Sequence, residues 1–590
     1  MRTVLSTSLL FVLGLCGIVL ADANLVRLLG PQGVNLWRLD AADAARRSSS
    51  LVIQDPLAAA SDSSPEFADH WFAQPLDHFS ESSPTFLQRY WINTRYYQPG
   101  SNGPVIVLDG GETSGEDRLP FLDTGIVEIL AKATGGVGVV LEHRYYGVCG
   151  FIFWLACIHK DVSGRSIPVT NLSTDSLRWL NNAQSAADSA NFMANIKFPG
   201  IKQDLTAPGT PWIYYGGSYA GARAAHMKVL YPDLVYGAIA SSAVTHASLE
   251  NWEYMEIIRR AARWKCSSQL EHSIAVIDAL LSTPGGFLKK HLKGLFGLAD
   301  LKHDEDFVSL LESPLGSWQA KNWDPKVGST RFDEFCDALN KPFFGHTLDK
   351  ALYSTAIYHE DSQIVMLPAM GGLSVPLPVF NYAKYIRENY VTRCPEGASI
   401  EQCFGTFDDA KFQDTSLNET WRLWVFQVCT EWGYFSTAPP EGHPRIVSKL
   451  LTLDYESKIC EQVRPVLIAL SGNGVTTLHG SGVSSRQAFR RPPFPNITSV
   501  NALGDFDIAA DRLAIIDGEV DPWRPDTPHS DYAQDRNDTI LRPFKLIPNG
   551  VHHYDEFGLR NISEEPPEIR RIHEEMIEFV VEWLKDWKAE

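Results

Sequence analysis

Apolar, β-branched runs that end in turn residues predict the strands of a buried sheet in this chain. Such runs are typical of strands that are covered on both faces. Four of them occur in the first half of the sequence, namely "PVIVLDGGE", "VGVVLEHRYYG", "PWIYYGGSYAG" and "VYGAIASSA". Two more, "RLAIIDGEVDPW" and "PFKLIPNGVHH", lie close to the C-terminus.

Helical patterns separate these two groups of strands. "ARAAHMKVLYP" favours a helix directly after the third run, and helical periodicity dominates residues 251–500, as in "SIAVIDALLS". The last residues place apolar side chains at helical spacing. Strands alternating with helices at both ends predict one α/β domain, built from residues 66–250 and 501–590, with a mostly helical cap inserted at 251–500.

Composition narrows the class of protein. The chain has 590 residues, of which 44% are hydrophobic and 21% charged, as in a folded globular protein. Its formal net charge of −19 argues against binding to nucleic acid or to an anionic membrane, because both reward basic patches.

The N-terminus has the pattern of a secretory signal. Arg2 precedes an apolar stretch over residues 4–20, which is followed by the small residues "LADA". A membrane-spanning helix would need roughly 20 apolar residues. We therefore expect a signal peptide over residues 1–23, and a linker or pro-like segment over residues 24–65, which are rich in Ala, Ser and Asp.

The cysteines and the sequons fit a secretory route. Cys16 would leave with the signal peptide, and Cys149 and Cys157 lie in an unusual segment considered below. The other six suggest disulfides, and although many connectivities are possible, we expect neighbours in sequence to pair. The expected pairs are Cys266–Cys336, Cys394–Cys403 and Cys429–Cys460. The candidate glycosylation sites are Asn171, Asn418, Asn496, Asn537 and Asn561.

Ser218 is the first candidate catalytic residue. It lies in a G-x-S-x-A sequence at a predicted strand-to-helix turn, where Gly216 and Ala220 are small enough for a sharp turn. Such a turn exposes the serine hydroxyl at the start of a helix. A match of this kind also occurs by chance in glycine-rich loops, so the interpretation depends on the strand before it and the helix after it.

A serine hydroxyl needs a base to remove its proton and a third group to orient that base. In α/β-hydrolases the chain order is Ser, then Asp or Glu, then His, with the last two on loops after late strands. Asp521 follows the strand "LAIID", and His552 and His553 follow "FKLIPNG". Both the order and the placement predict a Ser-Asp-His triad on an α/β-hydrolase fold.

Such a triad also needs backbone N–H groups that stabilise the oxyanion. The N–H of Tyr219, directly after the serine, is one candidate. The second should come from the loop after an early strand, where "LDGGETSG" provides Gly111.

Taken together, "GGETSGE", "EHRYYG", "GGSYAGARAAHMKVLYPDLVYGAIASSA", "FQVCTEWGYF", "GEVDPW" and "GVHHYD" resemble one family of serine peptidases. This family contains prolyl carboxypeptidase, dipeptidyl peptidase II, thymus-specific serine protease and the fungal prolyl endopeptidases. The similarity runs from about residue 66 to the C-terminus. It implies an α/β-hydrolase with a helical cap that cleaves on the carboxyl side of proline, usually at acid pH, in a secreted or lysosome-like setting.

The resemblance also implies roles for individual residues. Ser218 would be the nucleophile, Asp521 the orienting acid and His552 the base, since the family keeps the first histidine of "G-x-H-x-x-D". Trp523 resembles a wall of the proline pocket. Trp432 and Tyr434 are candidates for the same pocket, with plain core packing as the alternative. Glu112 or Glu431 is a candidate anchor for a substrate amino group, which would favour removal of dipeptides.

Residues 148–164, "VCGFIFWLACIHKDVSG", interrupt this pattern. Without them "EHRYYG" continues into "RSIP", as the family pattern does. The segment is too short and too interrupted for a membrane span. We interpret it as a retained intron in the gene model.

We therefore expect a secreted or vacuolar serine peptidase that acts on proline-containing peptides, without metal or organic cofactor and without nucleic-acid or membrane partners. Homodimer formation is left open. The alternatives are an esterase or lipase on the same fold and a catalytically inactive secreted binding protein.

Overall fold

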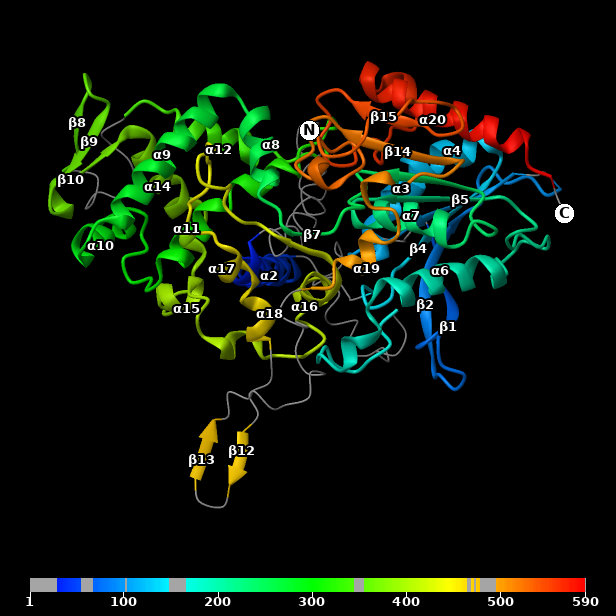
Figure 1. The fold of residues 1–590 in the computed structure, drawn as a ribbon, viewed down its shortest axis with the longest axis horizontal. Helices are drawn as coiled ribbons and strands as arrows, with labels where there is room; N and C mark the ends of the chain where they lie inside the picture. The colour runs from blue at the N-terminus through cyan, green and yellow to red at the C-terminus, as the bar shows by residue number, and fades with distance from the viewer. Residues whose placement is uncertain are drawn as a thin grey trace.

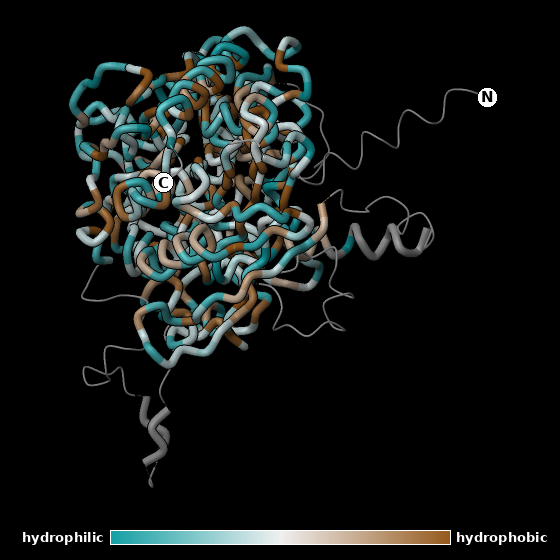
Figure 2. Tube along the Cα trace, turned by 90° about the vertical axis from the view of Figure 1, so that its right-hand side faces the viewer, coloured by the Kyte–Doolittle hydropathy of each residue, from teal (hydrophilic) through white to brown (hydrophobic). Residues whose placement is uncertain are grey.

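The computed structural model describes residues 29–54, 67–100, 103–147, 166–343, 355–463, 468–471, 474–477 and 495–588. The expected signal peptide and the whole of the unusual segment 148–164 lie outside these residues. Within the described part, no helix combines the length and hydrophobicity that crossing a bilayer requires. Hydrophilic and hydrophobic positions alternate along the traced chain (Figure 2).

An eight-stranded sheet organises the α/β domain, with the order β1-β2-β4-β3-β5-β6-β14-β15. β1 pairs antiparallel with β2, and β2 antiparallel with β4, whereas all later neighbours are parallel. In chain order the strands are β1 (His70–Pro75), β2 (Thr85–Asn93), β3 (Val105–Asp109), β4 (Val137–Leu141), β5 (Trp212–Gly217), β6 (Gly237–Ser241), β14 (Leu513–Gly518) and β15 (Phe544–Ile547). This topology is that of an α/β-hydrolase, as the sequence predicted.

Helices cover both faces of the sheet, which explains the continuous apolar runs of its central strands. Along β3, Val105 and Val107 pack with α6 (Asn182–Asn195) and α7 (Tyr219–Leu230). The alternate residues Ile106 and Leu108 pack with the opposite layer. That layer comprises α3 (Leu119–Asp123), α4 (Ile126–Thr134) and α20 (Pro567–Lys585).

The cap leaves the sheet after β6 and returns at β14, its neighbour, and it forms a separate lobe (Figure 1). Its helices are α8 (Glu253–Ala261), α9 (Trp264–Ser282), α10 (Gly286–Leu295), α11 (Asp304–Glu312), α12 (Arg331–Leu339), α14 (Leu377–Asn389), α15 (Ile400–Phe404), α16 (Trp421–Gln427), the π-helix η9 (Val428–Trp432), α17 (Leu453–Ser457), α18 (Ile459–Gln462) and α19 (Thr498–Asn501). Its strands are β7 (Ser248–Glu250), β8 (Ile357–His359), β9 (Ile364–Leu367), β10 (Leu373–Pro376), β11 (Gly433–Phe435), β12 (Ile468–Ser471) and β13 (Gly474–Thr477).

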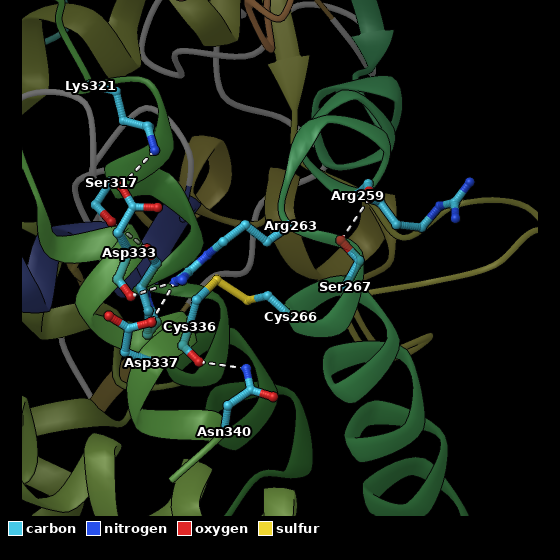
Figure 3. The surroundings of a disulfide bond; sticks show 11 residues. Arg259, Arg263, Cys266, Ser267, Ser317, Lys321, Asp333, Cys336, Asp337 and Asn340 are labelled. Carbon is cyan, nitrogen blue, oxygen red and sulfur yellow. Dashed lines mark hydrogen bonds and ion pairs between the residues drawn. A yellow bond between two sulfur atoms is a disulfide. The ribbon is translucent and has the colours of Figure 1, made fainter.

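The three expected disulfides all form between sequence neighbours, and all three lie in the cap. Cys266 of α9 is bonded to Cys336 of α12, beside an ion pair between Arg263 and Asp337 of 2.7 Å (Figure 3). The bond joins positions 70 residues apart and so restricts the unfolded chain strongly.

The N-terminal segment differs from the expected linker. Residues Gly30–Gln54 form a helix, α2, that lies among the cap elements (Figure 1). Val34 and Leu36 are buried in the apolar core of the cap. Arg38 contacts Glu419 at 2.8 Å, and Asp40 and Asp43 both pair with Arg393. Its few apolar residues lie in the first turns of the helix. The mostly polar composition of the whole segment therefore gave no indication that this short apolar face packs against the cap.

Candidate active site

The candidate catalytic residues follow neighbouring parallel strands of the sheet. Ser218 comes directly after β5, Asp521 follows β14 and His552 follows β15. β6 lies between β5 and β14, with Ser241 opposite both Gly217 and Ile516. Because the carboxyl ends of parallel strands meet at one edge, these side chains converge there.

Ser218 has the strained backbone expected of a serine at a sharp strand-to-helix turn. Its φ is 62° and its ψ −124°, and its N–H donates to the carbonyl oxygen of Ser241 at 2.9 Å. A Cβ at Gly216 would lie 1.9 Å from the carbonyl oxygen of Ala220, and one at Gly221 would lie 2.4 Å from that of Ser241. Only glycine fits these two positions, so the turn requires the local sequence seen here.

His552 and Asp521 form a buried hydrogen-bonded pair. The Nδ1 of His552 lies 2.9 Å from Oδ2 and 3.1 Å from Oδ1 of Asp521. Burial alone would raise the pKa of Asp521, but His552, the N–H of Trp523 and Ser242 favour the carboxylate and hold that pKa below its ordinary value. Asp521 is therefore an anion that can orient the imidazole and stabilise its protonated form.

The second histidine has different partners. The N–H of His553 donates to the hydroxyl of Ser242 at 2.8 Å, and its Nδ1 lies 2.8 Å from Glu556. Burial would lower the pKa of His553, but the charge of Glu556 outweighs it and raises that pKa. His552, and not His553, is thus bonded to Asp521, and His552 is also the residue that the family pattern assigns as the base.

The cap contacts both loops that carry this pair. Trp318 donates its indole N–H to the carbonyl oxygen of Val520 at 3.0 Å, and Trp323 donates to that of Tyr554 at 2.9 Å. Tryptophan side chains from one short cap segment therefore hold the loops on which Asp521 and His552 lie.

The two expected oxyanion donors differ in their bonding. Tyr219 is the first residue of α7, where N–H groups have no partner within the helix. The structure differs from the expectation at Gly111, because its N–H donates to Oδ1 of Asp109 at 3.0 Å. Its loop does lie against the nucleophile helix, since a Cβ on Gly111 would come within 3.3 Å of the Cβ of Ala220. The sequence could not show that Asp109 engages this N–H.

The three candidate pocket aromatics form one continuous row beside α7. The ring of Trp432 lies 5.2 Å from that of Tyr219 and 6.1 Å from that of Tyr434, which lies 5.3 Å from Trp523. Trp523 also donates to Gln319 at 2.7 Å. All of these rings are buried. The structure thus places the three candidates, Trp523 from the α/β domain and Trp432 and Tyr434 from the cap, in one buried row.

The two candidate amine anchors belong to different parts of the fold, Glu431 to the cap and Glu112 to the α/β domain. Glu431 belongs to η9 and accepts the N–H of Asn182, at the start of α6, at 3.1 Å. Burial raises the pKa of Glu431 to about 7. Glu112 is half-buried in the loop that follows β3. No group of three or more His, Cys, Asp or Glu side chains within the described residues could hold a metal ion.

The chain ends that flank the unusual segment lie together. The N–H of Tyr145 donates to the carbonyl oxygen of Ser166 at 2.7 Å, and the hydroxyl of Ser166 donates to Glu142 at 2.7 Å. Glu142 also pairs with Arg89. The "EHRYYG" motif therefore closes the base of this loop through a buried carboxylate, a role that the sequence did not suggest.

Comparison with known proteins identifies relatives of this chain. A family model described as Serine carboxypeptidase S28 matches residues 74–153 and 154–321. A probable extracellular serine carboxypeptidase of Arthroderma benhamiae is 37% identical over 90% of this chain and 69% of its own length. Thymus-specific serine protease of Mus musculus is 25% identical over 88% of each chain. Among solved structures, a proline iminopeptidase of Mycobacterium smegmatis covers 88% of this chain and 99% of its own, with 12% identity and a TM-score of 0.33. The chain therefore belongs to the serine carboxypeptidase S28 family of serine peptidases.

Proposed function

We propose that this protein is a secreted serine peptidase that cleaves peptides on the carboxyl side of proline through Ser218, His552 and Asp521. The observation that carries the proposal is the buried His552–Asp521 pair at the edge of the sheet where the strained Ser218 also lies. The three disulfides and the extracellular relative support secretion.

In the proposed reaction the hydroxyl oxygen of Ser218 attacks the carbonyl carbon of the proline residue, and its proton passes to Nε2 of His552. Asp521 stabilises the resulting imidazolium, and the N–H of Tyr219 donates to the oxyanion. Collapse breaks the C–N bond, and His552 gives its proton to the leaving amine. Water then attacks the acyl-enzyme by the same steps and restores Ser218.

Proline preference is supported by the row of Trp523, Tyr434 and Trp432. A pyrrolidine ring is rigid and apolar, so it can bury area against aromatic faces with little loss of conformational entropy. Glu431 or Glu112 would anchor a substrate amino group, since a cation near a buried carboxyl offsets the cost of its burial.

The test uses a set of peptides with proline second from the N-terminus, next to last, or internal, incubated at acid pH and analysed by mass spectrometry. Ser218→Ala is the control, and a serine-directed phosphonate reports the nucleophile. Cuts after proline at one location would establish both the specificity and the exo- or endopeptidase mode. Labelling without prolyl cleavage would favour an esterase, and a folded protein that neither labels nor cuts would favour an inactive binding protein.

We also propose that residues 148–164 are absent from the functional protein. The bonding of Tyr145 to Ser166 supports this, because a direct hydrogen bond joins the residues on the two sides of the segment. Sequencing of transcripts across this junction tests the proposal. It would be contradicted if most transcripts retained the 51 nucleotides that encode residues 148–164, about three per residue.

A further inference from the structure

A buried chain of hydrogen bonds joins the cap to the residue that follows the nucleophile. His143 and Tyr146 belong to the loop after β4, Tyr219 begins α7, and Gln427 ends α16. The Nε2 of His143 lies 3.2 Å from the hydroxyl of Tyr219, and Nε2 of Gln427 donates to the same hydroxyl at 2.8 Å. The hydroxyl of Tyr146 donates to Oε1 of Gln427.

The directions of these bonds are determined. The Nδ1 of His143 lies 2.8 Å from the carbonyl oxygen of Arg144, which can only accept, so Nδ1 carries the proton. Burial and the charge of Arg223 lower the pKa of His143 to about 4, so the ring is neutral above that pH and its Nε2 accepts. The hydroxyl of Tyr219 must then donate to His143 and accept from Gln427, so these hydrogen bonds have only one possible set of donors and acceptors.

This series of hydrogen bonds ends at the cap segment that carries the candidate specificity residues. Gln427 directly precedes η9, which contains Glu431 and Trp432. π-Helical turns are strained relative to an α-helix and frequently occur at functional sites. Trp424 and Trp432 both pack edge-on against the ring of Tyr219, at 5.4 and 5.2 Å.

The far side of η9 is held by other constraints. Cys429 is bonded to Cys460, and Gly433 has a φ of 76° with no room for a Cβ, which would lie 2.0 Å from the carbonyl oxygen of Ser248. The segment is therefore tied to the cap at one side. At the other side it is bonded to the α/β domain through the hydroxyls of Tyr219 and Tyr146 and the N–H of Asn182.

We propose that the side chain of Tyr219 is a positioning residue that sets the place of η9 relative to Ser218 and thereby determines how peptide substrates bind. The inference rests on the proposed peptidase function. Tyr219 would thus act through its backbone at the oxyanion and through its hydroxyl on the cap. Loss of the hydroxyl leaves buried polar atoms of His143 and Gln427 without this partner, so η9 loses its fixed register against α7.

Tyr219→Phe removes only the hydroxyl and tests the proposal. We expect the KM for a proline peptide to rise about tenfold, the equivalent of one to two lost buried hydrogen bonds, while the rate of labelling by a small serine phosphonate changes by less than about threefold. Gln427→Met, which breaks the chain from the cap side, should give the same split. The double variant should be no worse than Gln427→Met alone, because that substitution already removes the bond to Tyr219 as well as the bond to Tyr146.

Tyr145→Phe is the matched control. Its hydroxyl also lies in the "EHRYYG" loop, but it donates to the carbonyl oxygen of Ser176, which is outside the series of hydrogen bonds that ends at Gln427. This variant should leave both KM and labelling unchanged. An equal fall of labelling and of peptide turnover in Tyr219→Phe would overturn the proposal, since the defect would then lie at the nucleophile.

Hydrogen exchange of the peptide spanning residues 421–435 gives a readout that does not need activity. Faster exchange in Tyr219→Phe and Gln427→Met, but not in Tyr145→Phe, is expected. Unchanged exchange in both would refute the positioning role even if the wild-type protein cleaved no peptide. Absence of wild-type cleavage and labelling would instead refute the proposed function alone.

Discussion

At the scale of single residues, the site combines a backbone that only glycine permits with a charged pair that only burial makes effective. Ser218 adopts its strained conformation because Gly216 and Gly221 let the helix approach the strand. Asp521 remains ionised because His552 lies within hydrogen-bonding distance of both of its oxygens. Each feature can be removed by a single substitution of known geometry.

We predict that Asp521→Asn lowers kcat by about 10⁴-fold, because an amide cannot hold the imidazole in the required tautomer or stabilise its cation. Steady-state kinetics on the preferred prolyl peptide would measure this. The control is Asp517→Asn. Asp517 lies on β14, just before the loop that carries Asp521, and forms another buried pair with His529 at 2.6 Å, so its substitution should leave kcat within about threefold. Equal losses in the two variants would mean that both carboxylates act only on the fold.

Gly216→Ala should abolish the turn, because its Cβ would lie 1.9 Å from a backbone oxygen. Overpacking of this kind costs about 1–3 kcal/mol or more in the free energy of unfolding. Gly209→Ala, whose Cβ would meet nothing closer than 3.5 Å, is the matched control. Denaturant unfolding and phosphonate labelling would both be measured, and a stable, normally labelled Gly216→Ala protein would disprove the steric argument.

At the scale of elements, the cap and the α/β domain depend on contacts that run far along the sequence. α2 docks on the cap from the N-terminal end of the chain, and Trp318 and Trp323 of the cap hold the two late loops. The cap therefore also supports the loops on which Asp521 and His552 lie.

Leu36→Ala in α2 should lower the free energy of unfolding by about 2–5 kcal/mol, because the side chain is fully buried in the core of the cap. Arg46→Ala on the same helix, where the side chain is 59% exposed, should change it by less than about 0.5 kcal/mol. Chemical denaturation followed by tryptophan fluorescence would compare them. If the two variants matched, α2 would be a dispensable segment after all.

At the scale of the whole molecule, buried carboxyl groups make stability depend on pH. In the cap, burial raises the pKa of Glu312 to about 8, and burial together with the charge of Glu312 raises that of Glu456 well above 4.5. Ser436 donates to Glu312, and the charged groups acting on Glu456 also include Lys458 and Asp306. Both glutamates are thus favoured in their neutral form in the folded protein.

The folded state therefore binds more protons than the unfolded chain between about pH 4.5 and pH 8. Stability from this pair is present in full below about pH 4.5 and is lost as the pH rises through about 8, so the Tm should fall over that range. Glu456→Gln, which stays neutral, should flatten the slope. A Tm series from pH 4 to pH 8 on both proteins would measure this, and a steeper slope in the variant would contradict the assignment.

Several features could be predicted from sequence because they are local or follow chain order. The turn at Ser218 needs small neighbours within four residues, and the strands of the sheet are continuous apolar runs. The disulfides join cysteines that are neighbours along the chain, and the order of Ser218, Asp521 and His552 is that of the fold. The turn, the strands and the chain order depend on spacing along the chain, so the sequence by itself determined them. The disulfide pairing was one of many possible connectivities, and the tertiary structure selected it.

Other features depend on which distant segments meet, and only the tertiary structure decided them. The N–H of Gly111 is engaged by Asp109, α2 docks on the cap rather than serving as a linker, and the hydroxyl of Tyr219 connects two domains. No local pattern marks such contacts, because a buried polar group finds its partner wherever packing places one. The physical reason is that spacing restricts a residue to a face of an element, whereas burial and hydrogen bonding are settled by every element packed around it.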